Sequence, residues 1–343
     1  MPRRCYCLVA GFLLLLLSTG CQQQTETSLR FAGATMGTTW SVVLHPATGV
    51  DAAGLRRQLH QRLDQINALM STYDPDSEIS RFNRTPSSEW FAVSAETAQV
   101  ITLSQEVSRL TGGAFDISVG PLVDLWGFGA AERGGSIPTA DQVRAALDRV
   151  GYERLAVRRV PAAIRKEHPG MRIDLSAVAK GYAVDALAEL LDQHRITNFL
   201  VEIGGDMKLA GHREDGTPWR IALEKPVDHM RAVETILPLP ATALATSGNY
   251  RNFYEEGGQR YVHTIAPFSG WPIQHKLASV TVLDPSAARA DALATALMVM
   301  GEEQGRLFCE NHRIAAYFLI HDNAQTISYA SPALQSLLDG VQP

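Results

Sequence analysis

The chain has 343 residues, of which 45% are hydrophobic and 20% are charged, and its formal net charge at pH 7 is −5. This composition is that of an ordinary globular protein with a large core, and it excludes a disordered or a collagen-like chain. A mildly acidic balance also gives no reason to expect a protein that binds nucleic acid.

The N-terminus has the features of an export signal. Two arginines precede an apolar stretch, residues 8–17, which is too short to span a bilayer as a stable helix. Small residues then lead into Cys21, a pattern that resembles the lipidation site of a bacterial lipoprotein. We therefore expect a lipoprotein signal peptide over residues 1–20 and a lipid-anchored tether over residues 21–30. A plain secretory signal with a nearby cleavage site is the alternative.

Cysteine usage gives no disulfide framework. Cys5 and Cys7 lie in the signal and Cys21 would carry lipid, so Cys309 would be the one internal cysteine of the mature chain. A single internal cysteine can build neither a disulfide framework nor a thiolate metal cluster. We interpret Cys309 as a buried core thiol.

The first half of the chain is mostly helical by its pattern. Residues 38–45 read as a strand. Residues 51–70 carry apolar side chains at helical spacing behind Asp51, which is a natural N-cap. A second helix is expected over Ser94–Leu110.

Two more helices follow. Thr139 and Gln142 have the spacing of a capping box and predict a helix start. Residues 174–191 form the fourth long helix by their spacing, with Ser176 as a fair N-cap. Lys180 would lie about one turn into that helix.

After residue 195 the pattern changes to short segments rich in β-branched and aromatic residues, interrupted by one helix over 290–301. Helices first and strands later favour an α+β fold over alternating βαβ units. We expect one compact domain, in one lobe or two, over residues 31–340, with mixed or antiparallel sheets and several long helices. The segments read as strands are 198–205, 219–224, 260–265, 278–283 and 314–320.

The common phosphate and hydrolase motifs are missing. The sequence has no GxxxxGK[ST], HExxH or GxSxG pattern, and the stretch that starts like GxGxxG at Gly127 has Glu132 where the third glycine belongs. A phosphate-handling protein of this sequence would work without the usual signatures.

Lys180 is unusual because it shares a helix face with apolar residues. Lys180, Val184 and Leu187 follow at steps of four and three, which places them on one face. The positive end of the helix dipole would repel a lysine near the N-terminus unless an anion is bound there too. The lysine and the helix N-terminus together therefore form an anion site. Alternatively the side chain extends to solvent along its apolar stem, or pairs with an acid.

Asp291 and Thr295 are four residues apart and therefore share a face of the helix 290–301. A carboxylate and a hydroxyl can hold a hard cation, and Mg²⁺ takes few protein ligands while keeping water and phosphate oxygens. Alternatively, Asp291 only interacts favourably with the helix dipole from the first turn of the helix. Two such helices would clamp a metal-bound pyrophosphate, if they meet.

Taken together, segments across nearly the whole mature chain resemble the FAD:protein FMN transferases, the ApbE family. The resemblance implies Mg²⁺-dependent transfer of FMN from FAD to a threonine or serine of another protein through a phosphoester, with release of AMP. The segments are "GATMGTTW" (33–40), "STYDPDSEISRFN" (71–83), "GGAFDISVGPLVDLWGFG" (112–129), "DLSAVAKGYAVD" (174–185) with "VEIGGD" (201–206), and "HTIAPFSGWP" (263–272) with "DALATALMVMG" (291–301).

The resemblance also implies site residues. Tyr73 would stack on the flavin, and Lys180 would contact the pyrophosphate. The metal would be held by Asp291, Thr295 and the backbone carbonyl of Ala177. The positions that match FAD-binding residues are Met36, Ser71, Thr72, Tyr73, Asp116, Asp174, Lys180 and Ile265.

His263 is the candidate base for the attacking hydroxyl, with a structural histidine as the alternative. The family usually carries an acid where this chain has Ala266. If that carboxylate orients the histidine or assists the metal, we expect this protein to be slower or to use a neighbour such as Asp284. We do not expect it to be inactive, since the other acids are in place.

The runner-up activity is a Mg²⁺-dependent FAD pyrophosphatase, and a third reading is a flavin-binding lipoprotein without chemistry. By the same resemblance we expect the acceptor to be a subunit of a membrane redox complex. The domain would lie in the periplasm of the bacterial cell envelope, anchored by lipid to a membrane, with the inner membrane favoured.

Overall fold

The computed structural model describes residues 28–45, 49–130, 135–226, 232–250, 252–322 and 325–340. The expected signal peptide and Cys21 lie outside these residues, as does most of the tether. Within the described part of the chain, no helix has both the length and the apolar character needed to cross a membrane.

An eight-stranded sheet organises the fold, and all of its neighbouring strands are antiparallel. Its first two strands are joined by a tight turn at Met36 and Gly37, whose φ angles of 48° and 70° suit the twist of a two-residue hairpin. In spatial order the strands are β1 (Leu29–Thr35), β2 (Thr38–Leu44), β6 (Phe199–Ile203), β7 (Asp206–Ala210), β10 (Thr242–Gly248), β13 (Leu277–Asp284), β14 (Ala315–Asp322) and β15 (Gln325–Ala330).

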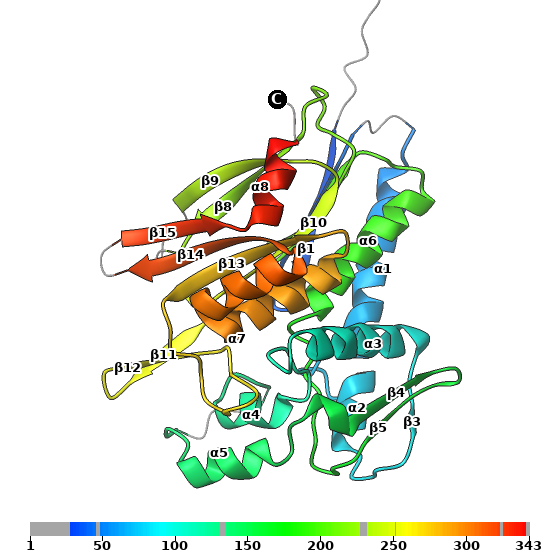
Figure 1. Ribbon diagram of the computed structural model, residues 1–343. Helices are drawn as coiled ribbons and strands as arrows, with labels where there is room; N and C mark the ends of the chain where they lie inside the picture. The colour runs from blue at the N-terminus through cyan, green and yellow to red at the C-terminus, as the bar shows by residue number, and fades with distance from the viewer. Residues whose placement is uncertain are drawn as a thin grey trace, which may run out of the picture.

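Three long helices cover one face of this sheet (Figure 1). Their apolar sides pack with sheet residues such as Trp40, Val201 and Val280 into the main core, which supplies most of the burial that stabilises the fold. The helices are α1 (Ala52–Met70), α6 (Ala179–Gln193) and α7 (Ala287–His312).

A two-stranded ribbon and a short helix cover part of the opposite face. The ribbon consists of β8 (Trp219–Lys225) and β9 (Ala232–Leu239), and the helix is α8 (Pro332–Asp339). Apolar residues of both, with Leu244 and Leu283 of the sheet, form a second core cluster. The helix α8 contacts both β14 and β9.

The remaining elements form the lower part of the molecule in Figure 1 and one hairpin beside it. The main core continues into this part through Phe82, Val100 and Ile164, so the same core joins it to the large sheet. These elements are α2 (Glu78–Arg84), β3 (Phe91–Ala92), α3 (Ala95–Leu110), α4 (Gly120–Leu125), α5 (Ala140–Leu147), a 3₁₀ turn (Tyr152–Arg154), β4 (Leu155–Arg159), β5 (Ala162–Lys166), β11 (Phe253–Glu256) and β12 (Gln259–Val262).

Two of the expected helix boundaries are wrong. The helix α6 begins at Ala179 and not near Asp174, and no side chain caps it, because Ser176 lies in a turn in which its N–H donates to the Asp174 carboxylate at 2.8 Å. The helix α7 runs from Ala287, so Asp291 lies beyond its first turn. It continues past Gly301, whose φ of 76° interrupts the helix without ending it.

Cys309 is buried, as expected, and burial raises the pKa of its thiol to about 12.

Candidate active site

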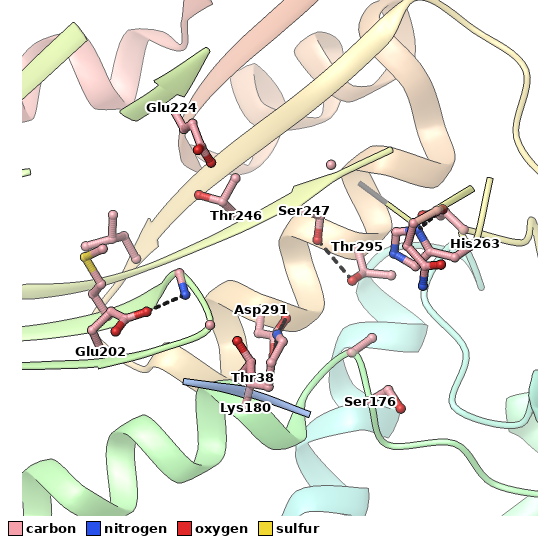
Figure 2. Close-up of a pocket in the computed structure, with 18 of the residues that line it drawn as sticks. Thr38, Ser176, Lys180, Glu202, Glu224, Thr246, Ser247, His263, Asp291 and Thr295 are labelled. Atoms are coloured by element: carbon pink, nitrogen blue, oxygen red, sulfur yellow. Dashed lines mark hydrogen bonds and ion pairs between the residues drawn. The ribbon is translucent and has the colours of Figure 1, made fainter. Parts of the chain in front are cut away.

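A cavity of about 960 Å³ opens where α6 and α7 approach the sheet, and it gathers most of the residues singled out in the sequence. Figure 2 shows Glu224 on one side of the Lys180–Asp291 pair and His263 on the other. Met36, Ser71 and Thr72 do not line this cavity. The expected site residues that do are Tyr73, Asp116, Asp174, Ala177, Lys180, His263, Ile265, Asp291 and Thr295.

Small residues bring the N-terminal ends of α6 and α7 together. A β-carbon at Gly181 would lie 2.3 Å from the Ala287 carbonyl oxygen, so only glycine allows this approach. Asp185 joins the same two ends by accepting hydrogen bonds from the Ser286 hydroxyl at 2.8 Å and the Ala288 N–H at 3.0 Å. The two helices therefore meet, as the pyrophosphate clamp requires.

Lys180 lies between two buried carboxylates at this junction. Its Nζ donates to Asp206 Oδ2 at 2.6 Å and to both oxygens of Asp291 at 3.3 Å. The side chains of Asp206 and Asp291 are only 1% and 5% exposed. Sequence reasoning singled out Asp291 but not Asp206, although Asp206 ends the matched segment "VEIGGD".

The charges of this cluster are tightly coupled. Burial, together with the neighbouring Asp291 carboxylate, raises the pKa of Asp206 to about 7 against the opposing effect of Lys180. Burial alone would lower the pKa of Lys180, but the carboxylates of Asp206 and Asp291 outweigh it and hold that pKa above its ordinary value. One lysine thus balances two buried acids, which leaves an excess of negative charge.

The donor set of this cluster fits a hard divalent cation. The excess negative charge and the oxygen donors are what Mg²⁺ requires. Thr295, whose hydroxyl lies 3.3 Å from that of Ser247, and Ala177 lie in the same cavity. The described residues hold no group of three or more His, Cys, Asp or Glu side chains suited to a metal. A cation here would therefore complete its shell with hydroxyl, carbonyl, water or substrate oxygens.

The loop after α1 overhangs the cavity and carries Tyr73. This side chain is 66% exposed, and its hydroxyl donates to the Phe128 carbonyl at 3.4 Å. Partial burial, followed by the charges of Asp174 and Asp124, raises the pKa of Tyr73. The Ser71 hydroxyl accepts from the backbone N–H groups of Tyr73 and Asp74, both at 3.2 Å, so Ser71 shapes the loop rather than lining the cavity.

The Asp116 carboxylate is engaged in more hydrogen bonds within the protein than we expected of a ligand-binding residue. Its carboxylate accepts from the N–H and the hydroxyl of Ser118, both at 2.7 Å, and from the Tyr152 N–H at 2.9 Å. Burial raises its pKa despite these bonds. A carboxylate has about four lone-pair sites, so little capacity is left for a ligand. Asp174 keeps more capacity to bind a ligand, since one of its carboxylate oxygens accepts a hydrogen bond only from the Ser176 N–H.

His263 is oriented as a base. Its Nδ1 lies 3.2 Å from the Asn252 carbonyl oxygen, which can only accept, so Nδ1 carries the proton and Nε2 keeps a free lone pair. Burial lowers the pKa of His263, and the positive charge of Lys180 lowers it further. The ring is therefore neutral at pH 7.

Ala266 lies in a turn closed by backbone hydrogen bonds, with its N–H 2.9 Å from the Trp271 carbonyl oxygen, and it is buried. The suggestion that Asp284 substitutes for the missing acid is wrong, because its oxygens accept from the Ser286 N–H and from Arg289 Nε and it does not line the cavity.

Comparisons with known proteins agree with this geometry. The family model "ApbE family" matches residues 36–318. The chain is 42% identical over 332 residues to the FAD:protein FMN transferase of Vibrio cholerae serotype O1, covering 96% of this chain and 98% of the relative. It is 36% identical over 339 residues to the protein of that name from Escherichia coli K12, covering 96% and 97%.

Solved structures give the same result. The flavin transferase ApbE from Vibrio cholerae superposes with a TM-score of 0.84 at 41% identity, covering 91% of this chain and 99% of that one. The ApbE protein of Thermotoga maritima superposes with a TM-score of 0.81 at 27% identity, covering 91% and 99%. The chain therefore belongs to the ApbE family.

Proposed function

We propose that this protein transfers FMN from FAD to a threonine or serine hydroxyl of an acceptor flavoprotein, with Mg²⁺, and releases AMP. The observation that carries the proposal is the Lys180 ammonium between two buried carboxylates, in a large cavity that also holds a neutral histidine. The family relatives named FAD:protein FMN transferase support the choice of FAD as the donor.

Asp291, Thr295 and the carbonyl of Ala177 would hold the Mg²⁺, with Asp206 beside them. When bound, the ion would draw charge from the phosphate oxygens. Lys180 adds positive charge at the same place and orients the pyrophosphate for in-line attack.

The acceptor hydroxyl attacks the phosphorus on the riboflavin side of FAD. A new oxygen–phosphorus bond forms while the bond from that phosphorus to the bridging oxygen breaks, and AMP leaves with the bridging oxygen. His263 Nε2 takes the proton of the attacking hydroxyl. Tyr73, on the overhanging loop, offers its ring face to the isoalloxazine and excludes water from that side.

Export and anchoring are part of the same proposal. A lipid on Cys21 would hold the domain, residues 31–340, at the periplasmic side of a membrane, where acceptor subunits of redox complexes are within reach. Recovery of the full-length protein in the membrane fraction, and of a Cys21→Ser variant in the soluble fraction, would test this.

The central test uses an acceptor domain known to carry covalent FMN on a threonine, expressed without flavin. The protein, FAD and Mg²⁺ are added, and intact-mass analysis looks for one added FMN while AMP is measured in solution. Free FMN without protein-bound flavin would identify a pyrophosphatase instead. Absence of AMP would identify a flavin-binding protein without chemistry.

Two substitutions connect the activity to this site. Lys180→Ala should abolish FMN transfer while the protein stays soluble. Lys276→Ala is the control, because Lys276 also donates to a carboxylate, that of Asp322 at 2.8 Å, but does not line the cavity. Equal loss of activity in both would contradict the assignment.

A further inference from the structure

The cavity extends well beyond the Lys180 cluster and reaches strand β8. Four consecutive residues of β8, 221–224, line it. Successive side chains of a strand point to opposite faces, so a cavity that touched only one face would meet every second residue. The cavity therefore reaches the backbone of β8 rather than one face of it alone, and it also meets Ala232 and Val233 at the start of β9.

The strand pairing shows which backbone groups lie on this edge. β8 and β9 are antiparallel, with Arg220 opposite Pro238 and Ala222 opposite Ile236. Because a proline cannot donate, the Arg220–Pro238 pair is of the non-hydrogen-bonded kind, and so is the Ala222–Ile236 pair two residues along. The N–H and C=O of Ala222 thus point away from β9, and Ala222 itself lines the cavity.

No other strand covers this edge in the described part of the chain, where β8 pairs with β9 alone. Strands β1 and β2 also contribute to the cavity wall, through Arg30, Ala32, Gly33 and residues 38–41. The space next to β8 is continuous with the cluster of Lys180 and Asp291, because the same cavity is lined by both.

We propose that the acceptor segment carrying the target hydroxyl binds as an added β-strand along the open edge of β8. This inference rests on the proposed function, which requires a polypeptide to enter the cavity. Main-chain hydrogen bonds to Arg220 and Ala222 would hold the segment, and its register would deliver the hydroxyl to the pyrophosphate beside Lys180.

The test removes one backbone donor. Ala222→Pro deletes the N–H that faces the cavity and leaves the β8–β9 ladder intact, as Pro238 already does at an equivalent position in β9. Ile236→Pro is the matched control, because it deletes the N–H of the cross-strand partner, which points away from β8. Ala32→Tyr is a second variant that narrows the space from the β1 side without changing β8.

Binding of the unflavinylated acceptor domain is measured directly, together with FAD affinity and the melting temperature. Ala222→Pro should weaken acceptor binding by about three- to tenfold, the value of one hydrogen bond. Ala32→Tyr should weaken acceptor binding as well, by steric exclusion. FAD affinity should not change, and Ile236→Pro should bind like the wild type.

Unchanged acceptor binding in both edge variants would overturn the proposal, and so would an equal loss of FAD affinity, which would assign the edge to the dinucleotide. Wild-type protein that binds the acceptor through this edge without transferring FMN would refute the proposed function and leave the edge site standing.

Discussion

Gly181→Ala tests whether the close approach of α6 and α7 builds the site. The added β-carbon would lie 2.3 Å from the Ala287 carbonyl oxygen and 2.7 Å from the Ala288 α-carbon. Real β-carbons essentially never come closer than 3.0 Å, so the two backbones must separate by about 0.7 Å, the difference between 2.3 and 3.0 Å. The neighbouring residue in α6 is Lys180, and the N–H of Gly181 itself donates to Asp291 at 3.1 Å.

The size of the effect follows from two general magnitudes. Overpacking a core contact costs about 1–3 kcal/mol of unfolding free energy. A displacement of about 1 Å in a site that positions reacting groups costs roughly 100-fold in rate. We therefore expect Gly181→Ala to lose about 10- to 100-fold in kcat while remaining folded.

The assay is FMN transfer by intact mass, with AMP release, alongside urea unfolding. Gly305→Ala in α7 is the control, where a β-carbon would lie 3.1 Å from the Phe318 ring and where the residue does not line the cavity. It should lose some stability and keep kcat. A wild-type kcat in Gly181→Ala would refute the view that this junction positions the Lys180 cluster.

Two further predictions concern pH. Because the pKa of His263 lies below 6.5, the transfer rate should rise with pH through a pKa below that value and stay level at neutral pH. The His263→Gln variant should not show this rise. A transfer rate that falls with increasing pH would exclude His263 as the base. The pKa of Asp206 is about 7 in the folded protein, against an ordinary value of 3.8. As pH rises, Asp206 therefore loses its proton in the unfolded chain before it does so in the folded protein. Its contribution to stability is present below about pH 4 and declines as pH rises to about 7. Mg²⁺ should therefore raise the melting temperature more at pH 8 than at pH 5.5, and Asp291→Ala should abolish this increase; an equal increase in that variant would exclude the metal assignment.

The helix starts that rest on local side-chain chemistry were predictable. Asp51 and Ser94 accept from the backbone N–H groups of Gly54 and Thr97, and Thr139 forms both halves of its capping box. Each of these signals lies within one turn of sequence, so no tertiary contact is needed to identify it. Ser176 has the same residue type but joins an Asx-type turn with Asp174, and only the packing of α6 on α7 decides between the two outcomes.

The sequence singled out most of the site residues individually, and the structure places them in one cavity, but the sequence does not show how they are arranged in space. Lys180 and Asp291 are 111 residues apart in sequence, and no local pattern states that their helices touch. The feature that brings them together is Gly181, which reads in sequence as an ordinary glycine in a helix. Asp206 was missed because it follows two glycines with positive φ at the start of β7, where an acid reads as a turn residue.

The shared charge at this cluster makes a last prediction for Lys180→Ala. Removing one partner of a buried ion pair usually costs about 3–5 kcal/mol, because the other charge is left uncompensated. Here the pKa of Asp206 is already about 7, so this carboxyl can take up a proton in place of the lost lysine. The variant should thus be close to wild-type stability at pH 6 and should fall increasingly below it towards pH 8, measured by urea unfolding without Mg²⁺. A stability difference that does not change with pH would mean that Lys180 does not balance these acids, and its inward orientation would then need another cause.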